Sequence, residues 1–342
     1  MTSSFSKPEN IHYITDTKLK WQRKGRGTGF EYLDEDGASL SEQEIVRIKT
    51  LAIPPAWAEV RVSPDEKSHI QAVGLDAKGR KQYIYHPDWI AYNQQHKFDS
   101  MVRFGEVLPV LREQVAADMR RHTLSKERIL GTIVWLLEHT FIRIGNIAYE
   151  KQNKSYGLTT LREKHVHVEG TTVKFSFKGK SGVYHEHDIT HPRIAQTIKQ
   201  CIELPGYKLF NYLDDNGNKQ LIDSKDVNEY LKSVTGESMS AKDFRTWGGT
   251  ALAGEFLYEL GSVDQVVPEK QAFTRAVEQV SEHLGNTTSV CRTYYIHPKI
   301  FSSYESKKLI PHFKKIYKQF ERSNHAGKLS PSEYAAWTLI QG

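Results

Sequence analysis

The pattern of apolar residues changes near residue 90, and this change constrains the fold more than any other feature of the sequence. Residues 1–90 contain short apolar runs separated by turn-forming residues, a pattern typical of β-strands. From residue 91 onward, apolar residues recur at the three- and four-residue spacing of amphipathic helices. We therefore predict an α+β protein, with a small β-rich domain in residues 1–90 and a mainly α domain in residues 91–342.

The β-rich region contains a predicted hairpin. Residues 69–73 and 82–86 are apolar runs that flank the basic turn at residues 76–80. Residues 30–33 form another strand candidate, because a turn-forming Asp-Glu-Asp-Gly follows them. Residues 53–57, Ile-Pro-Pro-Ala-Trp, should be extended because each proline disfavours helix in the residue before it.

Helix boundaries in the second domain are marked by capping residues. Residues 107–121 are amphipathic, and Ser125 is a plausible N-cap for a helix that continues to Ile144 and would contain Arg143. Ser240 to Asp243 matches a capping box, so Arg245 should lie in the first turns of a helix. Further helices are predicted at residues 269–284, ended by Gly285, and at residues 307–320.

Two further segments interrupt or follow these helices. Residues 165–189 alternate in the manner of strands and predict a three-stranded meander, with Lys178 and Lys180 in the last tip. Thr287 or Thr288 can cap a short helix that carries Tyr295, and Pro298 should end it.

Composition limits the class of protein. The chain has 342 residues, enough for two domains, and a formal net charge of +6, which favours a polyanionic partner. Two cysteines, Cys201 and Cys291, indicate a reducing compartment without a disulfide framework. The first residues lack the apolar core of a signal peptide, and no apolar run approaches the ~20 residues that span a bilayer. We expect a cytoplasmic protein without a membrane segment.

Five polar residues form a candidate site for attack on a DNA phosphodiester. Tyr295 can act as the nucleophile, and the planar guanidinium groups of Arg143 and Arg245 can each donate two parallel hydrogen bonds to phosphate. Lys180 can protonate the leaving oxygen, a role worth roughly 10²–10⁴ in rate. Asn286 lies nine positions before the tyrosine and can donate a further hydrogen bond.

Each of these residues also has an ordinary structural explanation. Arg143 could belong to a buried ion pair or lie on the polar edge of a helix, and Arg245 could be one of the arginines that are common near helix N-termini. A tyrosine is most often a packing residue. Lys180 could be a solvated turn residue, and Lys178 competes with it for the role of the acid. Asn286 follows Gly285 and could simply end a helix. The combination of the five residues, rather than any one of them, favours catalysis.

Two other motifs are weaker candidates. Residues 25–29, Gly-Arg-Gly-Thr-Gly, resemble a phosphate-binding loop, but a strand rather than a helix follows them, so we expect a basic loop. His185 and His187 share one face of a strand and lie close to His191, yet no cysteine is near in sequence. We predict no metal site and no cofactor.

Several short motifs together resemble the type IB DNA topoisomerases, in particular the compact poxvirus-like bacterial group. In the first domain the similar segments are residues 53–57 and 79–85. In the second they are residues 141–146, 178–180, 242–247, 284–286 and 295–298. Each motif is weak alone, whereas the set covers nearly the whole chain.

The resemblance implies a clamp around duplex DNA, made by a monomer that works without ATP or metal near the nucleoid. It implies that Tyr295 forms a 3′-phosphotyrosine, that Lys180 is the general acid, and that Asn286 and the two arginines hold the non-bridging oxygens. It also implies a DNA-facing surface in the first domain. The residues of that surface are Arg80, Gln82, Tyr83 and Tyr85.

One departure and two alternatives accompany this resemblance. Many family members carry histidine where this chain has Asn286, so the contact here should be neutral. A tyrosine recombinase is the nearest alternative, but it usually has histidine three residues before the second arginine, where this chain has Lys242. A non-catalytic DNA-binding module is the other alternative, although no catalytic residue is missing.

Overall fold

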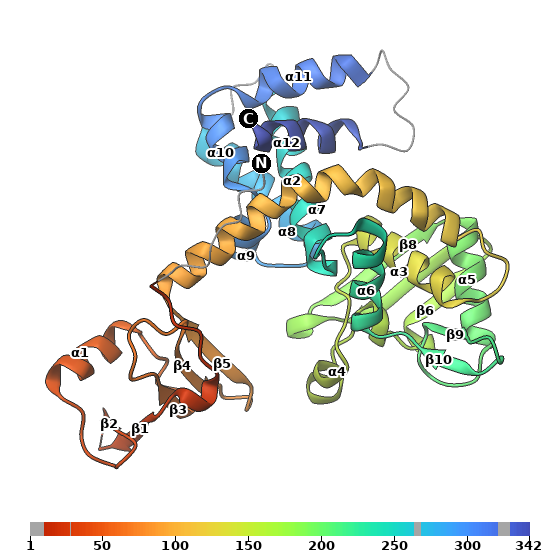
Figure 1. The fold of residues 1–342 in the computed structure, drawn as a ribbon. Helices are drawn as coiled ribbons and strands as arrows, with labels where there is room; N and C mark the ends of the chain where they lie inside the picture. The colour runs from red at the N-terminus through yellow and green to blue at the C-terminus, as the bar shows by residue number, and fades with distance from the viewer. Residues whose placement is uncertain (1–9, 28, 263–267, 321–328) are drawn as a thin grey trace. The chain divides into compact units, whose positions relative to one another are not determined.

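The computed structural model describes residues 10–27, 29–262, 268–320 and 329–342 (Figure 1). The chain divides into two compact units, residues 1–99 and 100–342. The division falls within α2 (Pro87–Asp118), a continuous helix of 32 residues that begins and ends earlier than the helix predicted at residues 107–121.

The first unit contains a five-stranded antiparallel sheet with the order β2-β1-β3-β4-β5. Its strands are β1 (Trp21–Arg26), β2 (Gly29–Leu33), β3 (Ala58–Val62), β4 (Ile70–Leu75) and β5 (Lys81–Tyr85). The hairpin predicted around residues 76–80 is confirmed, because β4 pairs with β5. The segment at residues 25–29 belongs mostly to a second hairpin rather than to a loop, because Gly25 of β1 pairs with Phe30 of β2. Thr28 lies outside the described residues.

One helix of this unit was not predicted from the sequence. The helix α1 (Glu42–Thr50) begins at Ser41, whose side chain accepts a hydrogen bond from Glu44 N while the Glu44 carboxylate accepts from Ser41. Ile48 of this helix is buried against the sheet residues Trp21 and Val62. This small core holds the sheet and the helix together.

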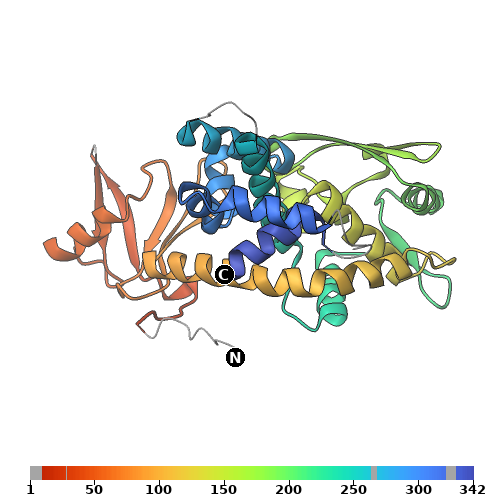
Figure 2. The same cartoon turned by 90° about the horizontal axis from the view of Figure 1, so that it is seen from above.

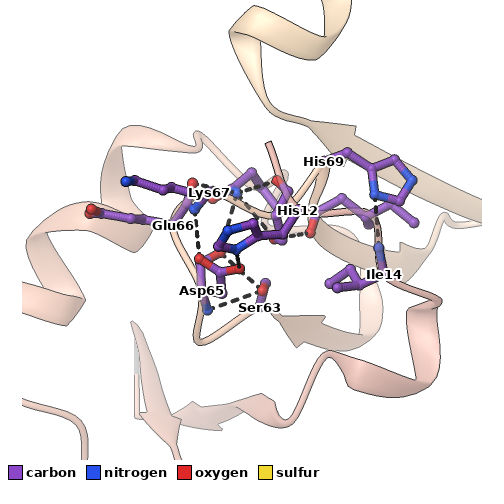
Figure 3. A network of polar contacts seen from close by, with 10 residues as sticks. His12, Ile14, Ser63, Asp65, Glu66, Lys67 and His69 are labelled. Carbon is purple, nitrogen blue, oxygen red and sulfur yellow. Dashed lines mark hydrogen bonds and ion pairs between the residues drawn. The ribbon is translucent and has the colours of Figure 1, made fainter. Parts of the chain in front are cut away.

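The N-terminal segment is fixed to the loop that joins β3 and β4 (Figure 3). His12 Nδ1 lies 2.7 Å from the Asp65 carboxylate, and the backbone of His12 exchanges hydrogen bonds with Lys67 O and His69 N, each 2.8 Å long. Ile14 N donates to His69 Nδ1 at 3.2 Å. A short 3₁₀ turn, η1 (Asp16–Lys18), then leads into β1.

The second unit is built around α7 (Ala241–Ser262), which contacts α3, α8, α10, α11 and α12. Figures 1 and 2 show α11 and α12 side by side over this core. Fully buried residues such as Ala253, Leu257 and Phe313 fill it. The helices are α3 (Lys126–Thr140), α4 (Ile147–Asn153), α5 (Pro192–Glu203), α6 (Ser224–Thr235), α8 (Glu269–Leu284), α9 (Thr288–Tyr294), α10 (Pro298–Glu305), α11 (Leu309–Phe320) and α12 (Pro331–Gln341).

The predicted meander is present as the antiparallel strands β6 (Val166–Glu169), β7 (Thr172–Lys178) and β8 (Tyr184–Thr190). The helix α5 packs against β6 and β7 (Figure 1). A two-stranded hairpin, β9 (Asn211–Leu213) and β10 (Lys219–Leu221), lies beside α3. Short 3₁₀ turns, η2 (Leu158–Thr160), η3 (Glu163–His165) and η4 (Lys180–Gly182), lie around the meander. The predicted α+β class is confirmed.

Two predicted helix boundaries were wrong, and both concern candidate site residues. The helix that starts at Ser125 ends at Thr140, because Phe141 adopts a left-handed conformation with φ +53°, so Arg143 lies in an extended segment rather than inside a helix. The short helix capped by Thr287 ends at Tyr294, so Tyr295 follows it, and Pro298 opens the next helix instead of ending this one.

Other boundaries match the sequence patterns. Gly285 ends α8 with φ +56°, and the Asp243 carboxylate accepts from Ser240 at the start of α7, as predicted. Among the described residues, no helix has both the length and the apolar character that crossing a bilayer requires.

A tight contact between α2 and two tryptophans gives a test of this packing. A Cβ added to Gly105 would lie 2.4 Å from Trp337 Cδ1 and 2.6 Å from Trp247 Cη2. Both rings are fixed by hydrogen bonds, to Val102 O and to the Glu333 carboxylate. Gly105→Ala gains about 1 kcal/mol of helix propensity but loses about 3 kcal/mol to overpacking.

We therefore expect Gly105→Ala to lower the free energy of unfolding of this unit by about 2 kcal/mol. Urea unfolding followed by tryptophan fluorescence measures it. Val110→Ala, at an exposed position of the same helix, is the control and should stay within about 0.5 kcal/mol of the parent protein. Equal stability of the two variants would contradict the packing argument.

Candidate active site

Arg143 is held by a short extended segment after α3. Leu158 N donates to Arg143 O at 2.9 Å, and Thr159 N donates to Ile144 O at 2.8 Å. Gly157 permits this approach, because a Cβ there would lie 2.4 Å from Arg143 O. The left-handed Phe141 turns the chain out of α3 and into this pairing. The guanidinium is thus presented from a backbone that is fixed on both sides.

Arg245 joins the ends of two helices. Its side chain is only 3% exposed, and it donates to Phe141 O, at the end of α3, and to Leu284 O at 2.6 Å, at the end of α8. A further donor, Nε, is buried and has no hydrogen-bond partner among the described residues. Arg245 therefore both organises the site and retains a donor that can serve a ligand.

Tyr295 is positioned by its backbone against α7. A Cβ added to Gly249 would lie 2.7 Å from Tyr295 O, so only glycine allows this contact. Thr250 Oγ1 donates to Tyr295 O at 3.3 Å and accepts from His297 N at 3.0 Å. The Arg245 guanidinium lies 5.1 Å from the centre of the Tyr295 ring. The tyrosine thus stands beside a fixed cation.

Asn286 is oriented by Arg143. Asn286 N donates to Ser281 O at 3.1 Å, which fixes the turn after α8. Arg143 Nη2 donates to Asn286 Oδ1, so the amide oxygen is occupied. The amide nitrogen Nδ2 is buried and donates to no acceptor among the described residues. The asparagine therefore keeps a buried donor at the site, and its amide also lowers the pKa of Tyr295.

The site carries positive charge that no carboxylate neutralises. Within the described ranges, neither Arg143 nor Arg245 forms an ion pair with an acidic side chain. Burial lowers the pKa of Arg143, and the neighbouring Arg245 lowers it further. Two cations this close favour an anionic ligand. Among the residues that the structure describes, the explanation of Arg143 as part of a buried ion pair is therefore wrong.

The same charges act on the two nucleophilic side chains nearby. Burial alone would raise the pKa of Tyr295, but Arg245, Arg143 and Asn286 outweigh burial and the pKa is lowered. Burial raises the pKa of the Cys291 thiol to about 11, although both arginines oppose the shift. The cysteine therefore stays protonated near neutral pH, whereas the pKa of the Tyr295 phenol is shifted down.

Lys180 stands apart from the other four residues. It lies in η4 at the tip of the β7–β8 hairpin, where its side chain is exposed and Ser181 has φ +62°. The link to the rest of the site runs through His185 of β8. A Cβ added to Gly179 would lie 2.5 Å from His185 Cδ2, and one added to Gly285 would lie 2.6 Å from His185 Cε1. The hairpin and the turn before Asn286 therefore meet the same imidazole.

Sequence reasoning missed the residues that create these close approaches. A Cβ added to Gly248 would lie 2.1 Å from Phe141 Cε1, and Gly249 admits the backbone of Tyr295. Two adjacent glycines inside a predicted helix each cost about 1 kcal/mol relative to alanine. This adjacent pair of glycines was the sequence feature that could have indicated close packing at Gly248 and Gly249. Nothing in the sequence pattern alone marked His185 as a neighbour of Asn286.

The candidate DNA-facing residues of the first unit divide between two faces of β5. Tyr83 and Tyr85 are 37% and 38% exposed, and their rings stack with centroids 5.9 Å apart. Gln82 alternates to the other face, where its amide donates to Asp76 at 2.9 Å. Arg80 also bonds Asp76, with Nε 2.8 Å from the carboxylate. Their role toward DNA stays a prediction.

The three histidines considered as metal ligands have structural roles. His191 is the N-cap of α5, where Nδ1 accepts from Ile194 N at 3.3 Å. His185 and His187 stack with ring centroids 5.9 Å apart. In the part of the chain that the structure describes, no group of three or more histidine, cysteine, aspartate or glutamate side chains is arranged to hold a metal ion.

The fold and the gathered residues define the class of protein, an enzyme that breaks and rejoins DNA strands. Comparison with known proteins gives the family. Residues 86–323 match the family model of the eukaryotic DNA topoisomerase I catalytic core, and residues 29–76 match that of the bacterial DNA topoisomerase IB N-terminal domain. The chain belongs to the type IB DNA topoisomerase family.

Individual relatives carry corresponding names. The DNA topoisomerase 1B of Acanthamoeba polyphaga mimivirus is 31% identical over 274 residues, which cover 78% of this chain and 81% of that protein. The DNA topoisomerase I of monkeypox virus is 25% identical over 244 residues, 70% of this chain and 73% of its own length. A DNA topoisomerase 1 of Mycosarcoma maydis is 26% identical over 58% of this chain and 22% of its own length.

The orientation of Asn286 gives a test of the site. Asn286→Asp preserves the oxygen that accepts from Arg143 but replaces the Nδ2 donor with an acceptor. We expect relaxation of supercoiled plasmid to slow by at least roughly 10²–10³, because one preorganised donor is lost and a negative charge is placed beside Arg143 and the phosphate. Asn286→His, which keeps a donor, is the control and should retain more activity. Equal rates for Asn286→Asp and the parent protein would show that the amide does not donate to the substrate.

Proposed function

We propose that this protein relaxes supercoiled duplex DNA by cutting one strand transiently through Tyr295. The Tyr295 hydroxyl loses its proton to solvent as its oxygen attacks a backbone phosphorus, a 3′-phosphotyrosine bond forms, and the bond from phosphorus to the 5′-oxygen breaks. Lys180 gives its proton to that leaving oxygen. Rotation of the free end releases torsion, and the 5′-hydroxyl then attacks the phosphotyrosine and restores the strand.

The observation that carries this proposal is the pair of arginines beside Tyr295, which have no carboxylate partner in the described part of the chain. Arg143, Arg245 and Asn286 Nδ2 are donors for the non-bridging oxygens, where negative charge grows in the transition state. The lowered pKa of Tyr295 favours its attack. Because the covalent bond conserves the energy of the cleaved one, the cycle needs no ATP, and the protein cations supply the charge stabilisation.

The first domain, residues 1–90, is assigned the clamping role, with a monomer enclosing duplex DNA. The stacked pair Tyr83 and Tyr85 offers exposed aromatic rings and hydroxyls at the sheet edge, with the ammonium of Lys81 5.8 Å from the Tyr83 ring. Arg80 and Gln82 are also assigned to DNA contact, although both bond Asp76 and Gln82 lies on the opposite face of β5 from the tyrosines. The net charge of +6 supports a polyanionic partner. Residence near the nucleoid in the cytoplasm follows from this role.

The nucleophile is tested by a change of one atom. Tyr295→Phe removes the attacking oxygen and should abolish both plasmid relaxation and the covalent adduct, while DNA binding persists. The assay uses positively and negatively supercoiled plasmid in EDTA without ATP, followed by a search for protein attached to a 3′ end. The parent protein should relax both substrates under these conditions.

Tyr294→Phe is the matched control, because Tyr294 precedes the nucleophile but is 47% exposed at the end of α9. It should retain relaxation and adduct. An adduct peptide that maps to Tyr294 or to a serine would overturn the assignment, and strict dependence on ATP or magnesium would overturn the mechanism.

The general acid is tested with a modified leaving group. Lys180→Ala should slow cleavage by roughly 10²–10⁴, with little effect on binding. A substrate with sulfur in place of the 5′-bridging oxygen needs little protonation, so it should restore cleavage by this variant selectively. Lys178→Ala, in the same hairpin, is the control. If Lys178→Ala shows the defect and the rescue instead, the assignment within the hairpin is wrong.

A further inference from the structure

His185 occupies a position between two pieces of backbone that carry proposed catalytic residues. Its Cδ2 and Nε2 atoms would lie 2.5 and 2.6 Å from a Cβ at Gly179, the residue before Lys180. Its Cε1 atom would lie 2.6 Å from a Cβ at Gly285, the residue before Asn286. The imidazole is thus in contact with both backbones, and each contact is possible because the neighbour is glycine.

The ring is held in this position by its strand. His185 pairs with Phe177 of β7, and the two rings stack with centroids 5.3 Å apart and an angle of 18° between planes. His187, two residues along the same face of β8, stacks on it at 5.9 Å. These neighbours restrict the ring's rotation. The stacked, half-buried ring is therefore a spacer that keeps a fixed position between the backbones of Gly179 and Gly285.

The electrostatic surroundings agree with a neutral spacer. Burial, together with the neighbouring His187, Arg143 and Arg245, lowers the pKa of His185 to about 4. The ring therefore adds no charge beside the two arginines near neutral pH.

The two sides of this contact differ in rigidity. The turn before Asn286 is fixed by Asn286 N, which donates to Ser281 O at 3.1 Å, and by the hydrogen bond from Arg143. The hairpin tip beyond Lys178 is held by its own short loop, in which Gly179 N donates to Val183 O at 2.7 Å. Removing the spacer should therefore move the hairpin rather than the turn.

We propose that His185 is a positioning residue that sets the distance between the Lys180 hairpin and the Asn286 turn, and so delivers the general acid to the leaving oxygen. This inference rests on the proposed role of Lys180. His185 acts through Lys180 and need not touch DNA itself. Its loss should therefore resemble a partial loss of the general acid.

The test compares His185→Ala on ordinary DNA and on DNA with a 5′-bridging sulfur. A displacement of about 1 Å can cost roughly 10²-fold in rate, so cleavage of ordinary DNA should slow by roughly 10- to 100-fold. Cleavage of the sulfur substrate should stay within roughly threefold of the parent protein, because that leaving group needs little acid catalysis. His167→Ala, an exposed histidine of β6 in the same sheet, is the control and should alter neither rate.

A second variant keeps the ring and tests the contact itself. Gly179 has φ −91°, which alanine adopts without strain, so the obstacle to Gly179→Ala is the His185 ring. Gly179→Ala should show the same defect with the same selective rescue by sulfur. In the double variant with His185→Ala the added methyl group has room, so the two effects should not add.

The outcomes separate the two proposals. If sulfur rescues Lys180→Ala but not His185→Ala or Gly179→Ala, the positioning role is wrong while the general acid stands. If sulfur fails to rescue Lys180→Ala, the role of Lys180 is wrong and this inference falls with it. His185→Phe keeps a flat ring without nitrogen, so it should remain closer to the parent than His185→Ala; an equal loss in both would indicate direct contact of the imidazole with DNA.

Discussion

The rest of the site depends on how the positive charge of the buried Arg245 guanidinium is stabilised. Burying a guanidinium normally requires a carboxylate partner, yet Arg245 donates to the carbonyl oxygens of Phe141 and Leu284. These carbonyls end α3 and α8, where the helix dipoles place partial negative charge. Partial charges stabilise the cation without cancelling it. The guanidinium thus stays available to an anion. It also binds the ends of both helices, one followed by Arg143 and the other by Asn286.

Close contact with the backbone is the second constraint, and each of these contacts is possible because the residue there is glycine. Gly249 lets the carbonyl of Tyr295 reach α7, Gly157 lets the chain pair with Arg143, and Gly179 and Gly285 receive the imidazole of His185. A methyl group at any of these positions would meet backbone or a ring that its neighbours hold. The chain gives up helix propensity at Gly249 so that the backbone of the nucleophile is fixed.

The sequence predicted those features that local chemistry decides. Several features could be predicted because each depends on residues that are neighbours in the chain. They are the capping by Ser125 and Ser240, the helix end at Gly285 and the alternation of the meander strands. It failed where tertiary contact overrides local preference. Phe141 in a left-handed conformation is uncommon for a bulky residue, and its ring is accommodated by the distant Gly248. The site residues could be proposed by resemblance, but the packing that holds them could not.

Asn286 shows how the site distributes its charge. A histidine at this position would change its charge near neutral pH, whereas the amide stays neutral and is oriented by Arg143. The other ring at the site, His185, is also neutral, since burial and the adjacent arginines lower its pKa to about 4. The positive charge that lowers the pKa of Tyr295 therefore comes from two guanidinium groups. The neutral side chains supply direction and spacing, and the arginines supply charge, so positioning and electrostatic stabilisation are carried by different residues.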